Sequence, residues 1–237
     1  MPSIDLMTSF SSSNVVILKV LKDLNGSKKP TLCITSALPE NPTTSASRTL
    51  KTMCCALTCT PILTQLWITS SLEEKNLVHP KDNMYIKNLP TRTTSIEDGG
   101  KLQEYSKLGV SRFICREEKL LEDIHVIICG AWKIGAKKSD IKLLLKECGA
   151  STHSTMKTIP KPLKDRKIIM LCDDSENAVT PTLYKASEIV LRDKDKDSLL
   201  IVGGSWLFDC ISCSCLLDGK DYSPKGTKSK ELWRMQY

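Results

Sequence analysis

The stretch that decides the fold is Gly204-Ser205-Trp206-Leu207-Phe208-Asp209-Cys210-Ile211. The apolar residues 199–202 precede it, so we expect a short buried strand that leads into an amphipathic helix. A second stretch, Gln65-Leu66-Trp67-Ile68-Thr69-Ser70-Ser71-Leu72, has the same pattern and follows the apolar residues 61–63. Each stretch is also followed by a tyrosine, Tyr85 in the first and Tyr222 in the second. Two copies of one pattern indicate an internal repeat.

The region before the first tryptophan alternates between strand and helix patterns. Residues 4–10 predict a strand, and the apolar spacing over 14–24 predicts a helix that Gly26 ends. A further strand is expected over 31–35. It is followed by a helix over 48–57, for which Ser47 is the expected cap.

The region before the second tryptophan follows the same order. We expect a strand over 125–129, a helix that Ser139 caps and Gly149 ends, and a strand over 167–172. The fold class is therefore α/β: two repeats, each a small central parallel sheet flanked by helices, joined by a linker helix. The predicted boundaries are 1–90 for the first repeat, 91–123 for the linker with its helix, and 124–237 for the second repeat.

The composition is that of an intracellular globular protein. The chain has 237 residues, 41% of them hydrophobic and 26% charged. No apolar run approaches the ~20 residues of a membrane span, and the start has no secretory pattern, so we expect no membrane partner. The eleven cysteines are an odd number and lie mostly in apolar segments, which favours reduced thiols in the nucleus or cytosol. The net charge of +7 favours acidic partners.

Metal and catalytic sites are not indicated. Two cysteine sets, 54/55/59 and 210/213/215, each lie near one helix, and neither has the paired knuckles of a structural zinc site. The three histidines stand far apart in sequence, and no phosphate-cradling glycine loop or nucleophile elbow is present. We therefore expect no metal, no cofactor and no enzymatic activity.

With a tryptophan helix late in each copy, the chain resembles a tandem BRCT module over nearly its whole length. The opening residues 4–10 and the run Arg48-Thr49-Leu50-Lys51 are similar to those of the microcephalin-like branch of this family, and to the branch of the mediator of DNA-damage checkpoint protein. Two departures are a four-residue connection, 27–30, with little room for a second strand, and Ser9 where the family often has glycine.

The resemblance implies that Thr8, Ser9 and Lys51 bind a phosphate. A phosphorylated side chain offers about −1.5 to −2 charges and three acceptor oxygens. A hydroxyl and a backbone N–H at the end of a strand suit those oxygens, and so does a lysine in the first turn of a helix. Arg48 is one helical turn before Lys51, and in the family this arginine reads the residue three positions after the phosphate.

The resemblance implies a nuclear adaptor of the DNA-damage response that binds a phosphoserine peptide. A phosphorylated histone tail is the first ligand to try. The alternative is a BRCT module that binds proteins without phosphate, or binds DNA. Thr8 and Ser9 as simple turn residues, and Arg48 and Lys51 as a solvated helix face, are the plainer interpretations of the same residues.

Overall fold

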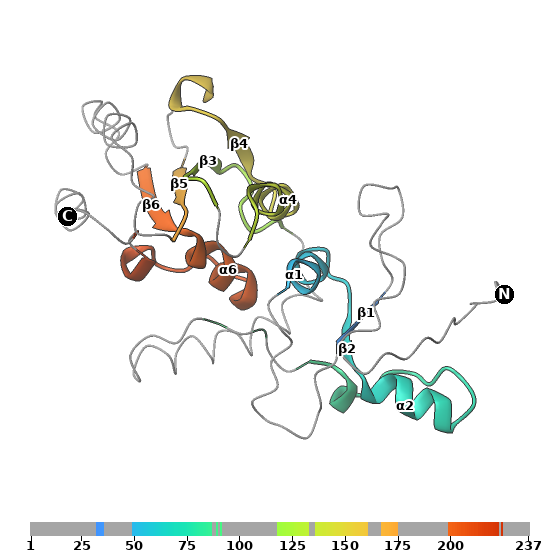
Figure 1. Cartoon of the computed structure of the whole chain (residues 1–237). Coiled ribbons are helices and arrows are strands. Elements are labelled where there is room, and N and C mark those ends of the chain that lie inside the picture. Colours follow the sequence, from blue (N-terminus) through green and yellow to red (C-terminus); the bar gives the residue numbers. More distant parts are fainter. Residues whose placement is uncertain are drawn as a thin grey trace.

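Two small parallel sheets and the helices around them make up the described part of the chain. The computed structural model describes residues 32–35, 49–86, 89, 91, 118–132, 136–160, 167–174, 199–222 and 224 (Figure 1). The predicted strand over 4–10, the helix over 14–24 and the linker helix lie outside these residues. The boundaries of the two repeats therefore stay a prediction. No helix among the described residues is long and apolar enough to cross a membrane.

The first repeat contains β1 (Cys33–Thr35), α1 (Leu50–Leu57), β2 (Ile62–Thr64) and α2 (Leu66–Glu73). A short 3-10 helix, η2 (Asp82–Met84), follows. β1 and β2 pair in parallel, with Cys33 opposite Ile62. Since α1 connects two parallel strands, it runs antiparallel to both of them. The α/β order predicted for this half is confirmed within the described residues.

The second repeat has a four-stranded parallel sheet in the order β4-β3-β5-β6. The strands are β3 (His125–Cys129), β4 (Ser151–His153), β5 (Ile168–Cys172) and β6 (Leu199–Gly203). The helices are α4 (Lys138–Glu147) and α6 (Gly204–Cys213), with the 3-10 turns η3 (Met156–Thr158) and η5 (Lys220–Tyr222). The sequence predicted β3, β5, β6 and both helices. It missed β4, because two of its three residues are exposed at the sheet edge and have no apolar pattern.

Two helix starts differ from the prediction. Thr49, not Ser47, is the N-cap of α1, and its Oγ1 accepts a hydrogen bond of 3.2 Å from the Thr52 amide. Ser139 lies inside α4, whose N-cap is Lys137. There the Lys137 amide donates to the Asp140 carboxylate at 3.3 Å. In both cases a polar residue near the helix start was mistaken for the capping position.

The predicted end of α4 is confirmed. Gly149 follows the last turn with a φ of 87°, which glycine adopts without penalty.

One hydrophobic core joins the repeats through α1. This helix packs against both α4 and α6, as its central place in Figure 1 shows. The core cluster includes Met53, Cys54, Cys55 and Ala56 of α1, Ile141, Leu144 and Leu145 of α4, and Trp206, Leu207, Cys210 and Ile211 of α6. A second cluster, built from Ile127, Cys129, Ile159, Ile168, Met170, Cys172 and Leu199, lies on the opposite face of the second sheet. Among the described helices, α1 is therefore the one that packs the first repeat onto the second.

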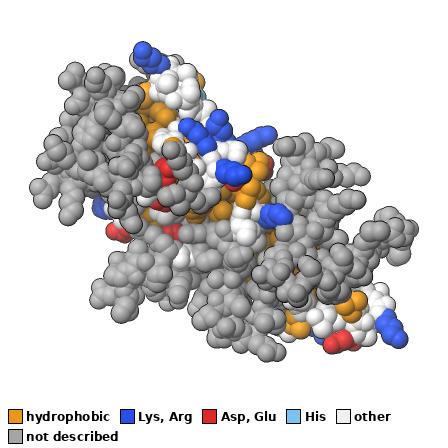
Figure 2. Space-filling view, viewed as in Figure 1, with side chains coloured by type: hydrophobic (Ala, Val, Ile, Leu, Met, Phe, Trp, Pro, Cys, Tyr) orange, Lys and Arg blue, Asp and Glu red, His pale blue; other side chains and the backbone are white. Residues whose placement is uncertain are grey.

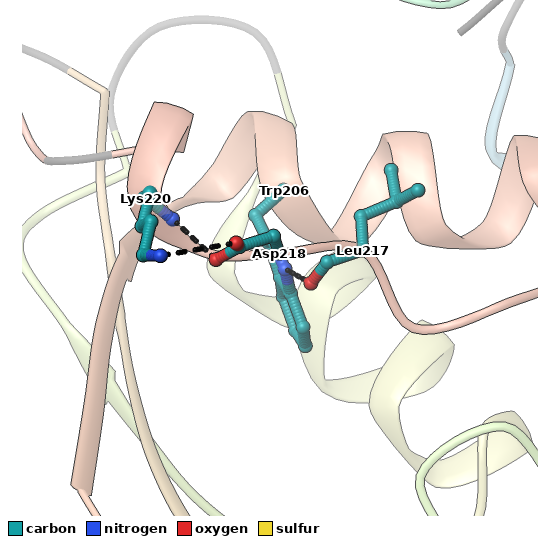
Figure 3. A network of polar contacts seen from close by, with 4 residues as sticks. All are labelled: Trp206, Leu217, Asp218 and Lys220. Carbon is teal, nitrogen blue, oxygen red and sulfur yellow. Dashed lines mark hydrogen bonds and ion pairs between the residues drawn. The ribbon is translucent and has the colours of Figure 1, made fainter. Parts of the chain in front are cut away.

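The two tryptophans occupy matching positions but are buried differently. Trp206 is only 2% exposed, and its indole Nε1 donates to the Leu217 carbonyl at 2.9 Å (Figure 3). Beside it, Lys220 contacts the Asp218 carboxylate in an ion pair of 3.8 Å. Trp67 makes the same kind of bond to Val78, also at 2.9 Å. The prediction that both are core residues holds for Trp206, whereas Trp67 is half-buried on a helix that has no fully buried residue.

Candidate functional site

Of the four residues predicted to bind the phosphopeptide, the structure describes one, Lys51. Thr8, Ser9 and Arg48 lie outside the described residues, so their roles stay predictions. Lys51 is the second residue of α1 and is half-buried. It therefore stands in the first turn of the helix that packs between the repeats.

The start of α1 is well defined. Thr49 and Thr52 form a reciprocal capping box, in which the Thr49 amide also donates to the Thr52 hydroxyl at 3.1 Å. Such a box holds two of the amide groups that a helix start otherwise leaves without partners. No acidic residue lies in the first turn. The positive end of the helix dipole therefore adds to the charge of Lys51 and is not neutralised by the helix itself.

The charge of Lys51 is not paired within the described residues. Among the described residues no carboxylate lies within ion-pair distance of its ammonium group. The charge of Lys51 also affects the neighbouring Cys33 thiol. A hydrogen bond with Cys55 lowers the pKa of Cys33, and the charge of Lys51 lowers it further, whereas burial raises it. Cys55 contacts Cys33 at the amino end of β1. Lys51 is one helical turn earlier in an antiparallel helix, so it lies toward the carboxyl end of β1.

In the second repeat, side chains of the repeat itself cover the sheet edge that the carboxyl ends of its strands form. We call this the closed edge. Trp132 follows β3, and its amide donates to the Asp173 carboxylate at 2.8 Å while its indole Nε1 donates to the Cys129 carbonyl at 2.9 Å. Asp174 accepts a hydrogen bond of 2.8 Å from the Ser205 amide at the start of α6. Two carboxylates and a buried indole therefore occupy the carboxyl ends of β3 and β5.

This closed edge does not suit a phosphate. The helix start that would attract an anion is already covered by Asp174, and Asp173 stands beside it. Gly204 is required there, because an added Cβ would lie 2.6 Å from Cη2 of Trp132. Sequence reasoning missed this arrangement, although Asp173-Asp174 directly after one apolar run and Gly203-Gly204 at the end of another were visible as a signal. At the start of α1 in the first repeat, by contrast, Lys51 has no carboxylate partner among the described residues.

The cysteines provide no metal centre in the described part of the chain. There, no group of three or more His, Cys, Asp or Glu side chains is placed to hold a metal ion. The sets 54/55/59 and 210/213/215 fall in this part, and none of these cysteines is in a disulfide. Burial, followed by the charges of Glu147 and Asp140, raises the pKa of Cys54 to about 12. That thiol is therefore a neutral packing residue between α1 and α4.

The fold matches a solved tandem BRCT pair. The crystal structure of the BRCT5–BRCT6 domains of S. pombe Brc1 superposes with a TM-score of 0.54 at 17% identity, and the match covers 84% of each chain. The chain has the tandem BRCT fold. This confirms the α/β fold class, with small parallel sheets flanked by helices, that the tryptophan repeat predicted.

Other solved structures are more distant. A fragment of Rtt107p matches with a TM-score of 0.45 at 14% identity, covering 81% of this chain and 74% of that one. A complex of Rtt107p with a phosphorylated histone matches with a TM-score of 0.46 at 15% identity, over 81% of this chain and 75% of that one. No protein-family profile matches the chain, and no curated protein matches it. The microcephalin-like and mediator-like branches are not singled out by any of these matches.

Proposed function

We propose that this chain is a non-enzymatic adaptor that binds a phosphoserine peptide through its first repeat. The observation that carries the proposal is Lys51. It is a cation in the first turn of α1, beside a capped helix start without acidic residues, and no carboxylate of the described segments pairs with it. A phosphate placed there meets both the ammonium charge and the helix dipole. Charge-assisted hydrogen bonds of this kind are about twice as strong as neutral ones.

The place of α1 in the fold supports a peptide ligand. α1 packs against α4 and α6, so an anion held at Lys51 lies close to the junction of the two repeats. A peptide that continues from the phosphate then has surface from both repeats within reach. The sequence places Thr8 and Ser9 at the end of a strand expected to be parallel to β1, which would bring them to the same edge as Lys51.

The proposal includes the finer assignments made from the resemblance. These are a place in the microcephalin-like branch, a role in the DNA-damage response inside the nucleus, and a phosphorylated histone C-terminus as the first ligand. They rest on the opening residues 4–10 and on Arg48-Thr49-Leu50-Lys51. The alternative, a BRCT module that binds proteins without phosphate, differs in one measurable respect, the effect of removing the phosphate.

The test is calorimetric titration of the chain with a phosphoserine peptide and its unphosphorylated twin. The parent chain is expected to bind the phosphopeptide at least about tenfold more tightly, which corresponds to about 1.4 kcal/mol. Lys51→Met should remove this preference with little change in the melting temperature, since a solvent-accessible cation contributes little to folding. Lys81→Met, at an exposed lysine after α2, is the matched control and should bind like the parent. Equal binding of the two peptides by the parent would contradict the proposal.

A further inference from the structure

A row of lysines runs along the outer face of α4. Lys138, Lys142 and Lys146 are all exposed and are spaced four residues apart, so they lie on one side of the helix. We call them the α4 lysine row. In Figure 2, Lys and Arg side chains gather over the part of the surface where α4 and α1 lie. With a rise of about 1.5 Å per residue, the row is about 12 Å long.

Helix stability does not account for the row. Like charges four residues apart destabilise a helix. Lys138, together with the N-cap Lys137, also stands at the positive end of the helix dipole, where cations are unfavourable. Only Lys146, in the last turn, stands where the dipole favours a cation. No acidic residue of α4 is three or four positions from any lysine of the row.

The acidic residues of α4 lie on its other flank. Asp140 and Glu147 are seven positions apart, and both raise the pKa of Cys54 in α1, so this flank faces the first repeat. The lysine row is therefore turned away from the junction of the repeats and from α1. Within the described part of the chain no carboxylate forms an ion pair with Lys138, Lys142 or Lys146. The helix thus separates its acidic side chains from its row of cations.

We propose that the α4 lysine row binds the phosphate backbone of duplex DNA, separately from and independently of the phosphopeptide site. Over the about 12 Å of the row, a duplex presents about seven phosphate charges. A protein interface has an apolar centre with aromatic anchors, which the row lacks. The exposed large hydrophobic residues of the described segments lie outside α4; they are Leu72, Leu77 and Leu216. A straight row of cations without apolar neighbours fits a polyanion backbone better than a folded partner.

The experiment measures the anisotropy of a labelled duplex of arbitrary sequence between about 50 and 200 mM salt. Lys142→Gln/Lys146→Gln should weaken binding at least about tenfold and make the slope of log affinity against log salt shallower by about two. Lys75→Gln/Lys81→Gln removes the same charge from the exposed region after α2 and is the control. It should change the affinity much less. Gln keeps a good helix former at each α4 position, and melting curves of both variants check the fold.

Three results overturn the proposal. Equal loss in both variants would show attraction by net charge alone, and no loss in the α4 variant would show that the row does not contact DNA. Binding of a poly-glutamate peptide that depends on the row, with DNA binding unchanged, would assign the row to an acidic protein partner. The phosphopeptide affinity of the α4 variant should equal that of the parent. This readout separates failure of the DNA surface from failure of the phosphopeptide site.

Discussion

The indole nitrogen of Trp206 donates a hydrogen bond of 2.9 Å to the carbonyl of Leu217, eleven residues further along the chain. Trp67 makes the same bond, at the same length and the same separation, to Val78. A second bond accompanies each: the Leu217 amide donates to the Cys210 sulfur, and the Val78 amide donates to the Ser71 hydroxyl, both at 3.3 Å and seven residues apart. In both repeats the tryptophan helix therefore binds the following chain through the same two hydrogen bonds, although the residues at these positions differ.

Truncation of the two tryptophans should have unequal effects. Trp206→Ala is expected to lower the free energy of unfolding by about 3–5 kcal/mol, because the ring is 2% exposed in the core that joins the repeats. Trp67→Ala should cost clearly less, since that ring is half-buried. Urea denaturation of both variants measures the difference. Unchanged stability of Trp206→Ala would contradict its place in the core.

A change at Gly204 should affect the closed edge of the second repeat. Gly204→Ala places a Cβ 2.6 Å from Cη2 of Trp132, so the indole or the helix must shift. We expect a loss of stability of about 1–3 kcal/mol, the range for overpacking. Trp132→Phe removes the clashing part of the ring, so Gly204→Ala should cost less in that background. Additive effects in this double-mutant cycle would mean that the two residues do not meet.

The buried thiol of Cys54 predicts a dependence on alkaline pH. Burial, and then the charges of Glu147 and Asp140, raise its pKa from 9.0 to about 12. The folded chain therefore keeps a proton that the unfolded chain releases above pH 9, and the stabilisation from Cys54 is present below that pH and lost as pH rises toward 12. Stability of the parent should fall more steeply over this window than that of Cys54→Ala. Parallel curves in denaturant titrations would contradict the shift.

Thr8→Val tests the hydroxyl predicted to meet the phosphate. Valine has a similar shape but no donor, so one hydrogen bond to a charged group is lost, worth about 1.5–3 kcal/mol of binding free energy. The affinity for the unphosphorylated peptide should stay the same. Thr8→Ser keeps the hydroxyl and should retain most of the parental phosphopeptide affinity in the same calorimetric assay. If valine and serine behave alike, the Thr8 hydroxyl does not contact the phosphate.

Arg48 is predicted to read a free peptide C-terminus three residues beyond the phosphoserine. A guanidinium matches a carboxylate with two parallel hydrogen bonds, which lysine cannot copy. Amidating that C-terminus should weaken binding by about 1.5–3 kcal/mol. Arg48→Ala should no longer distinguish the two peptide forms, and Arg48→Lys should recover only part of the loss. Should the parent bind both forms equally, Arg48 does not read a terminus, and the histone-tail ligand loses its main support.

The sequence alone determined the repeat, the fold class and most strands and helices of the second copy. The runs 125–129 and 168–172 are buried along their whole length, and Trp206 follows the apolar strand 199–203, so apolar pattern and structure agree. The sequence also indicated Lys51 as a cation in the first turns of a helix. It could not locate β4 or the exact caps of α1 and α4, because exposed polar residues have no periodic signal and several neighbours can cap a helix.

Only the tertiary structure decided how the two repeats pack together and which cations they leave without a carboxylate partner. That α1 packs against both α4 and α6 depends on contacts between residues far apart in the chain, which a local pattern does not encode. The same holds for the edge where Trp132, Asp173 and Asp174 meet, and for the lack of a carboxylate partner, within the described segments, at Lys51 and the α4 lysine row. A cation becomes a candidate anion site only when folding leaves it without a carboxylate nearby, and that outcome depends on where the folded chain places its charges.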